Sequence, residues 1–261
     1  MLPKSFHAIV AAALAVQATP LEKRKVVNHD SITPFPETVP AGAIGTTFKR
    51  FEPYLHIAHG CQSYPAVAAN GDVRYVSPPQ APNPANHLTT HTPPLSGGLQ
   101  DTGSSTGGCR DTGKGQTYVR GGWHNGRFGI MYAWYMPKDM PNSGVSAGAH
   151  RHDWENVVIW VNNPAVANPA LLGGAASGHG SYKKTASPQR QGDRPKVEYF
   201  TNFPTNHELQ FTDTLGRDLA LIAWDSLPGA AREGLESADF GKATVPFKDS
   251  TFLGNLAKAA L

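Results

Sequence analysis

Residues 125–136, N-G-R-F-G-I-M-Y-A-W-Y-M, join a tight-turn dipeptide to a run of apolar and aromatic side chains. Asn125-Gly126 is a strong hairpin signal, because both residues tolerate the positive φ angles of a two-residue turn. The run from 128 to 136 is apolar at odd and even positions alike, so a strand there would be buried on both faces. The stretch predicts a hairpin over residues 116–136 whose second strand is central in a sheet and ends at Pro137.

The flanking sequence supplies further elements for the same sheet system. A loop over 138–148 leads to an apolar strand at 157–161. Further strands are predicted at 196–200 and 218–224, although the latter could instead begin a helix. Helices are predicted at 227–237, after a Ser226 N-cap, and at 251–260, after Asp249-Ser250. There is no internal repeat or linker, so the chain is predicted to be mainly β, a single-domain β-sandwich with peripheral helices.

The densest polar segment lies directly before the strand at 157–161. Residues 149–155 read A-H-R-H-D-W-E, with two imidazoles, two carboxylates and one guanidinium. Polar groups at the mouth of an apolar strand are costly unless they are paired or bind something. Imidazole nitrogen with carboxylate oxygens suits a divalent cation. The alternative is a solvated polar turn with an internal salt bridge.

Strand periodicity indicates which of these side chains could converge. Asp153 and Glu155 have the same parity and share a face, whereas His152 and Trp154 take the opposite face. His150 has the wrong parity, so we expect it on a loop that turns before the strand. Asp139, placed just past the end of the neighbouring strand, is the expected fourth ligand.

Three carboxylates and one imidazole favour Mg²⁺ or Ca²⁺ over Zn²⁺, which prefers more His or Cys. Arg151 could offset the negative charge or contact an anionic headgroup; an ordinary surface arginine is the alternative. No separate nucleophile or general base is evident beyond the ligands themselves.

The N-terminus has the pattern of a secretory signal. Lys4 precedes an apolar run at 8–16, and a small-residue cleavage pattern follows, so residues 1–18 are predicted to be a signal peptide. Lys23-Arg24 would end a short pro-segment at 19–24, unless these charges simply begin the mature chain. The remaining chain, residues 25–261, is long enough for one core. Its product is predicted to be secreted and extracellular.

Charge and cysteine content agree with this compartment. A net charge of +3 is too small and dispersed to argue for nucleic acid. Cys61 and Cys109 are predicted to form one disulfide, with a pair of free thiols as the alternative. The disulfide would stabilise residues 77–108, which are rich in Pro, Gly, Ser and Thr and lack the apolar periodicity needed to form a packed core.

The heptapeptide at 149–155 also resembles a family signature. It differs at one position, Ala149, from G-H-R-H-D-W-E of the necrosis- and ethylene-inducing peptide-like proteins. The segment from Ile130 to Asp139 resembles the part of that family sensed by plant immune receptors, and the two cysteines resemble its two-cysteine subgroup. The resemblance covers essentially the whole mature chain.

This resemblance implies a fold and a function. Members are secreted cytolysins of plant-associated microbes with an actinoporin-like β-sandwich and a bound divalent cation. They recognise the sugar head of glycosyl inositol phosphoryl ceramide and permeabilise plant plasma membranes. The resemblance assigns the metal ligands to Asp139, His150, Asp153 and Glu155, and places Arg151, His152 and Asp218 beside the ligands or the headgroup.

Two other functions stay open. A secreted metal-dependent hydrolase would also place His and carboxylates around a cation. A non-cytolytic family member would be recognised by plant immunity without permeabilising membranes.

Overall fold

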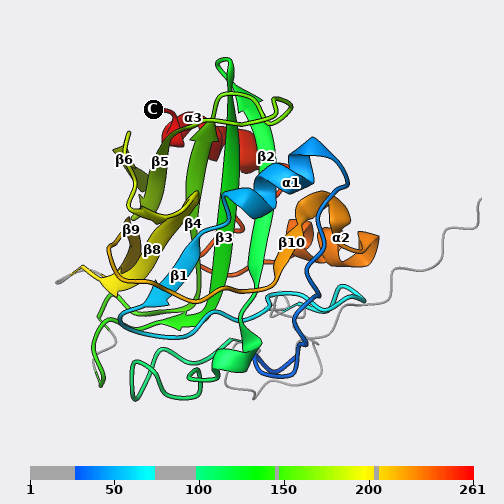
Figure 1. Cartoon of the computed structure of the whole chain (residues 1–261). Helices are drawn as coiled ribbons and strands as arrows, with labels where there is room; N and C mark the ends of the chain where they lie inside the picture. Colours follow the sequence, from blue (N-terminus) through cyan, green and yellow to red (C-terminus); the bar gives the residue numbers. More distant parts are fainter. Residues whose placement is uncertain (1–26, 74–97, 145–146, 203–205) are drawn as a thin grey trace, which may run out of the picture.

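Two β-sheets face each other in the computed structural model, which describes residues 27–73, 98–144, 147–202 and 206–261 (Figure 1). The six-stranded sheet has the order β10-β2-β3-β4-β5-β6, and β10 runs parallel to β2 while the other neighbours are antiparallel. Its strands are β10 (Leu221–Ala223), β2 (Thr117–His124), β3 (Arg127–Asp139), β4 (His150–Val161), β5 (Leu171–Gly178) and β6 (Ser181–Thr185).

The smaller sheet is built around β8 (Arg194–Thr201). β8 pairs in parallel with β1 (Tyr54–Ile57) and antiparallel with β7 (Arg190–Gln191) and β9 (His207–Phe211). β9 packs against β4 and β5, so the smaller sheet covers one face of the larger one. This contact brings polar residues of β8 and β9 to the end of β4 where the polar heptapeptide lies.

Three α-helices lie around the sheets: α1 (Ala43–Arg50), α2 (Gly229–Ser237) and α3 (Phe252–Ala259). Figure 1 shows α1 in front of the larger sheet and α3 behind it. Phe252 and Leu256 of α3 lie directly over Gly122 and Gly129, where a β-carbon would collide with them. In the described residues, no helix is long and apolar enough to span a bilayer.

The predicted hairpin and its central strand are confirmed. Asn125 and Gly126 have φ angles of 48° and 75°, the left-handed values that the turn requires. β3 is buried from Phe128 to Asp139 because β2 and β4 flank it and both of its faces are covered.

Several predicted boundaries are wrong. β3 does not end at Pro137 but continues two residues to Asp139, and Leu99 donates its backbone N–H to the Pro137 carbonyl at 2.9 Å. Proline is tolerated there because the residue opposite, His152, has a φ of 57° that interrupts regular pairing.

The helix starts and one strand also need correction. Ser226 ends a 3-10 turn, Trp224–Ser226, and α2 begins later, after Pro228. The strand predicted at 218–224 shortens to β10. Helix α1 was not predicted, and α3 begins after Thr251 rather than at it.

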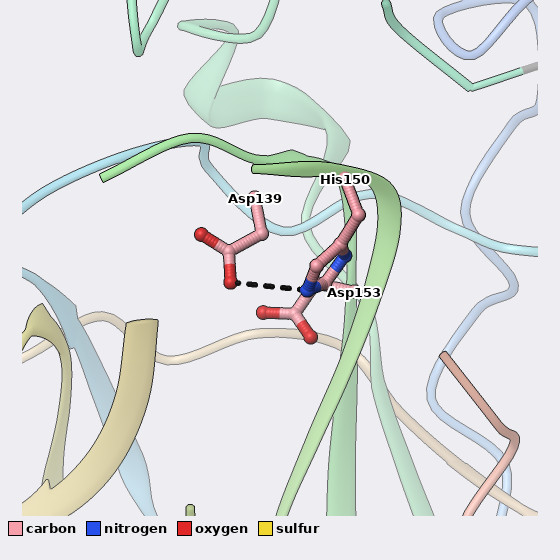
Figure 2. A group of neighbouring side chains, drawn as sticks. All are labelled: Asp139, His150 and Asp153. Carbon is pink, nitrogen blue, oxygen red and sulfur yellow. Dashed lines mark ion pairs between the residues drawn. The ribbon is translucent and has the colours of Figure 1, made fainter. Parts of the chain in front are cut away.

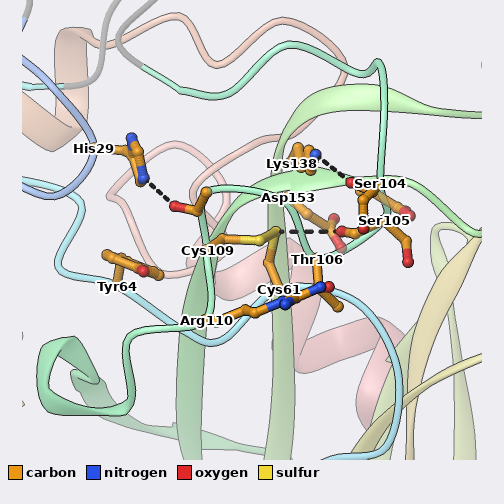
Figure 3. Close-up of a disulfide and its surroundings, with 12 residues drawn as sticks. His29, Cys61, Tyr64, Ser104, Ser105, Thr106, Cys109, Arg110, Lys138 and Asp153 are labelled. Carbon is orange, nitrogen blue, oxygen red and sulfur yellow. Dashed lines mark hydrogen bonds between the residues drawn. A yellow bond between two sulfur atoms is a disulfide. The ribbon is translucent and has the colours of Figure 1, made fainter. Parts of the chain in front are cut away.

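The predicted disulfide between Cys61 and Cys109 is confirmed, with both cysteines fully buried (Figure 3). The described part of the loop that the disulfide closes is held by backbone and side-chain bonds to β3 and by one contact with His29. Lys138 donates its ammonium to the Ser104 carbonyl at 2.7 Å, and His29 contacts the Gly108 carbonyl at 2.5 Å. The signal peptide and pro-segment predictions lie outside the described residues, as do residues 74–97 of the disulfide loop.

Candidate metal centre

The polar end of the β3–β4 pair gathers three ligand-bearing side chains. Asp139 is the last residue of β3 and pairs in register with His150, the first residue of β4. One ligand atom each from Asp139, His150 and Asp153 lie within 4.8 Å of one another (Figure 2). Asp139 and Asp153 are buried, and His150 is partly exposed. Pairing of the antiparallel strands β3 and β4 thus brings Asp139 beside His150, which lies 11 positions later in the sequence.

A distortion at His152 explains how His150 joins this group. Regular alternation would put His150 and Asp153 on opposite faces, and the turn was expected in a loop before the strand. That expectation is wrong, because His150 lies within β4 and the reversal occurs at His152, whose φ is 57°. Ala149 is not among the positive-φ residues; the glycine before it, Gly148, has that conformation instead.

The smaller sheet supplies residues that sequence reasoning missed. His207, the first residue of β9, donates its backbone N–H to Asp139 and places its Nδ1 at 2.5 Å from Asp139 Oδ1. Tyr199 of β8 donates its hydroxyl to Asp153 at 2.7 Å, and its ring stacks on His207 at 4.5 Å between centroids. These two side chains fix the orientation of both carboxylates, as supporting residues do around metal ions.

The hydrogen bonds of His150 leave one ring nitrogen as an acceptor. Its Nδ1 donates to the His152 carbonyl at 2.8 Å, because a carbonyl can only accept. In the tautomer with its proton on Nδ1, the ring has a lone pair on Nε2, which lies 2.9 Å from the Asn206 side-chain amide and 3.5 Å from Asp139. This tautomer is the one that a metal-binding imidazole needs on the side facing the carboxylates.

The electrostatics of the group also fit a cation. Burial, followed by the charge of Asp139, raises the pKa of Asp153. Burial and the nearby Asp153 carboxylate raise the pKa of Glu155 well above its ordinary value. Buried carboxylates that repel one another are stabilised by a divalent ion, which favours their charged forms. The donor set of carboxylate oxygens and one imidazole suits Mg²⁺ or Ca²⁺.

Glu155, the fourth predicted ligand, lies close to the three but outside the tight group. It is buried on the Asp153 side of β4 and accepts a hydrogen bond from the Ser177 hydroxyl of β5. Asp153 and Glu155 line one cavity of about 520 Å³, together with His150, Asn206 and His207.

The other predicted residues lie elsewhere. His152 points to the opposite face of β4, where Tyr135 bonds to its Nδ1 at 2.6 Å and Phe240 packs against its ring. Arg151 is half-buried and pairs in register with Lys138. Asp218 is held by Arg194 at 2.6 and 3.1 Å, an arrangement that engages its carboxylate within the protein.

Comparison with known proteins assigns the chain to a family. The sequence model described as Necrosis inducing protein (NPP1) matches residues 46–75 and 90–259. The chain belongs to the NPP1 family of necrosis-inducing proteins. It is 40% identical to NLP effector protein 10 of Phytophthora capsici, over 97% of this chain and 98% of that protein.

Solved structures of relatives show the same fold. NLPPya in complex with mannosamine superposes with a TM-score of 0.76 at 40% identity, covering 91% of this chain and all of the other. The non-toxic HaNLP3 protein superposes with a TM-score of 0.76 at 36% identity, covering 89% and 98%. The predicted actinoporin-like β-sandwich with peripheral helices is thereby confirmed.

Proposed function

We propose that this protein is a secreted, cation-dependent cytolysin that binds sphingolipid headgroups of plant plasma membranes and permeabilises them. The observation that carries the proposal is the convergence of Asp139, His150 and Asp153 at the open end of the sandwich. Membership of a necrosis-inducing family supports it, because lysis of host cells is a direct cause of necrosis.

The bound ion would be Mg²⁺ or Ca²⁺, held by Asp139, His150 and Asp153 with Glu155 alongside. A hard cation of this kind retains open positions for water or for ligand hydroxyls. When bound by these residues, the cation would supply a Lewis-acidic site for sugar oxygens. His207 and Tyr199 hold the carboxylates in place, and the cavity beside Glu155 has room for the sugar.

The ligand we propose is the sugar head of glycosyl inositol phosphoryl ceramide. Two structures of one relative support a carbohydrate ligand, since NLPPya has been solved in complex with mannosamine and with glucosamine. A cavity of about 520 Å³ lies within the roughly 300–1,000 Å³ usual for small-molecule sites.

We propose that the cation serves recognition rather than hydrolysis, so the protein is not an enzyme. Polar groups around the site have orienting roles: His207 and Tyr199 bond to the carboxylates of Asp139 and Asp153, and Ser177 bonds to Glu155. A metal-dependent hydrolase is the competing function, and it requires the lipid to be cleaved. A second candidate, a non-cytolytic binder, is favoured by the 36% identity to the non-toxic HaNLP3 protein.

A plant immune receptor is the second proposed partner, through the segment from Ile130 to Asp139. This segment lies in β3, whose backbone pairs with β2 and β4 and whose side chains are buried on both faces of the sheet. A receptor that reads it would therefore need a peptide released by proteolysis rather than the folded protein.

Paired leakage and mass-spectrometry measurements test the proposed function. Vesicles of phosphatidylcholine and sterol, with or without glycosyl inositol phosphoryl ceramide, are loaded with dye and treated with protein in Mg²⁺ or in EDTA. We expect release only with the glycolipid and the cation, and recovered lipid that is chemically unchanged. Multiple-turnover cleavage dependent on Asp153 would identify a hydrolase, and cation-dependent binding without leakage would identify the non-cytolytic binder.

A further inference from the structure

A second cavity, of about 470 Å³, lies along α2, which Figure 1 shows beside β10. The α2 residues that line it include Gly229, Arg232 and Glu236, which are three and four positions apart and share one face of the helix. Trp224 and Asp249 line it from outside the helix. This cavity shares no lining residue with the cavity beside the metal centre, and its volume is usual for a small-molecule site. It is therefore a separate candidate site.

Arg232 gives this cavity a positive end. Its Nε–H is buried without an acceptor, and within the described ranges its guanidinium makes neither a hydrogen bond nor an ion pair. A buried donor without an acceptor is costly. Side chains on a helix lean toward its N-terminus, so Arg232 leans toward Gly229. No side chain caps α2 there, and the first N–H groups of a helix favour an anion. This end suits the oxygens of a phosphate.

The negative end lies one helical turn further along α2. Glu236 is four positions after Arg232, or roughly 6 Å along the helix axis. Its carboxylate accepts the Asp249 backbone N–H, and no lysine or arginine among the described residues forms an ion pair with it. Asp249, by contrast, is already paired with Arg120 at 2.7 Å. Glu233 adds a further carboxylate to the lining. This end suits an ammonium group, which the C-terminal half of a helix also favours.

Trp224 gives the cavity an apolar wall. The residue is only 4% exposed, and Phe247 contacts its ring edge-on at 5.6 Å between centroids. The Arg120 guanidinium lies 5.3 Å from the centre of the ring. These contacts fix the indole, whose remaining surface can contact the carbon atoms of a ligand. The lining thus combines a guanidinium, an apolar wall and carboxylates.

We propose that this cavity binds a phospho-ammonium zwitterion, of which phosphocholine is the simplest probe. Its phosphate is held by Arg232 and the start of α2, its ammonium by Glu236 and Glu233, and its carbon atoms lie against Trp224. An α-amino acid fits less well, because both of its charges are attached to one carbon and cannot reach both ends. This inference goes beyond the proposed function, and the site needs no metal ion. A lipid headgroup and a free solute could both supply this chemistry.

Calorimetric titration of the full secreted protein in EDTA tests the proposal. The probes are phosphocholine, inorganic phosphate and choline, and EDTA prevents a metal ion from holding the phosphate. We expect one phosphocholine per chain. It should bind about tenfold or more tightly than phosphate or choline alone, because each of these pairs with only one end.

Two variants separate the ends. Arg232→Gln should weaken phosphocholine and phosphate by about tenfold without weakening choline. Glu236→Gln keeps an acceptor for the Asp249 N–H, and it should weaken phosphocholine and choline by about tenfold without weakening phosphate. Arg190→Gln and Asp213→Asn remove the same charges outside the cavity lining and should change each affinity by less than about twofold. A merely structural role for Arg232 or Glu236 would weaken all three probes alike.

Three results would overturn the inference. They are no saturable binding of phosphocholine up to about 10 mM, binding no tighter than that of phosphate or choline alone, and unchanged phosphocholine affinity in both variants. The proposed function stands in each case, because its test depends on the glycolipid and the cation.

Flotation with phosphatidylcholine vesicles in EDTA identifies the source of the ligand when phosphocholine binds. Flotation that Arg232→Gln loses supports a lipid headgroup. Flotation that is absent, or that this variant keeps, supports a free solute.

Discussion

Two acidic clusters in this protein, each with at least one buried carboxylate, differ in how their negative charge is balanced. The Arg194 cluster contains Glu52, Arg194 and Asp218. Arg194 donates to the Glu52 carbonyl at 2.6 Å and to both Asp218 oxygens, and its guanidinium lies 4.0 Å from the centre of the Tyr54 ring. The Arg194 hydrogen bond lowers the pKa of Asp218, while burial raises that of Glu52 to about 8. This cluster carries its own counterion.

The cluster at the end of β3 and β4 contains Asp139, His150, Asp153 and Glu155. In the described part of the chain, no lysine or arginine pairs with these three carboxylates; their partners are imidazoles, hydroxyls and the His207 backbone N–H. The comparison shows that this second cluster has no cationic side chain of its own among the described residues, which supports our proposal that it takes a cation from solution. Substitutions in the Arg194 cluster should therefore affect stability, whereas those at the β3–β4 end should affect cation binding.

The largest loss of stability is expected for Arg194→Met. It should lower the free energy of unfolding by about 2–4 kcal/mol, because the buried carbonyl and carboxyl of Glu52 lose their donor. Urea denaturation measures this loss. Arg190→Met, at an exposed arginine 4.0 Å from Asp193, is the control and should change stability by less than about 0.5 kcal/mol. Equal losses in both variants would contradict the role given to Arg194.

Gly60→Ala is expected to lower both the free energy of unfolding and the affinity for the cation, with a smaller loss of stability than Arg194→Met. Gly60 has a φ of 80°, and a β-carbon there would lie 2.6 Å from His207 Nε2. We expect a loss of about 1–3 kcal/mol from backbone strain and collision. Displacement of His207 from Asp139 should also weaken cation binding by about tenfold or more.

Gly192→Ala is a matched control for this variant. Gly192 also has a positive φ, 62°, but nothing lies within 4 Å of the added β-carbon. It should reproduce the strain and leave cation affinity unchanged. If both variants bind the cation like wild type, His207 does not support the centre.

Glu52→Gln should change the pH dependence of stability. The folded-state pKa of Glu52, about 8, lies above its ordinary value of 4.5. Below about pH 4.5, Glu52 is neutral in both the folded and the unfolded protein, and its burial carries no charge penalty. As the pH rises from 4.5 toward 8, Glu52 ionises more readily in the unfolded protein, so the free energy of unfolding falls. Relative to Glu52→Gln, wild type should lose stability with rising pH by about 1 kcal/mol per pH unit between 5 and 7. Thermal denaturation at several pH values measures this difference. If stability changes with pH in the same way in wild type and Glu52→Gln, the role given to Glu52 is contradicted.

The smallest stability effect is expected for Asp153→Asn. In EDTA its free energy of unfolding should lie within about 1 kcal/mol of wild type or above it, because repulsion between carboxylates falls while the side-chain shape is kept. Differential scanning calorimetry makes the comparison, with the exposed Asp213→Asn as control. A large loss of stability without metal would instead support an internal salt-bridge role for the heptapeptide.

Local sequence patterns predicted much of the fold and the convergence of Asp139, His150 and Asp153, but not the groups that bond to them. The Asn125-Gly126 turn and the run that is apolar on both faces predicted the central hairpin. The density of polar side chains in residues 149–155 singled out Asp153 and His150. The positive φ of His152 could not be predicted, because non-glycine residues rarely adopt it. It is this distortion that places His150 beside Asp153.

The missed residues depend on long-range pairing. His207 and Tyr199 reach Asp139 and Asp153 only because β8 and β9 pack over β4, a contact that no local periodicity specifies. The available signal was a polar His207-Glu208 pair entering a short apolar stretch, similar to the start of β4. Helix α1 was missed because Gly45 and two threonines lower its intrinsic propensity, and burial of Phe48 stabilises it instead.

Calorimetric titration with Mg²⁺ and with Ca²⁺ tests the central claim most directly, namely that the β3–β4 cluster takes its counterion from solution. We predict that wild-type protein binds one divalent cation per chain and releases protons as it does so, since carboxylates with raised pKa values must ionise. Asp153→Asn should weaken that binding by about a hundredfold, with Asp213→Asn unchanged. Absence of binding up to about 10 mM of either cation, or equal affinity in wild type and Asp153→Asn, would contradict the account.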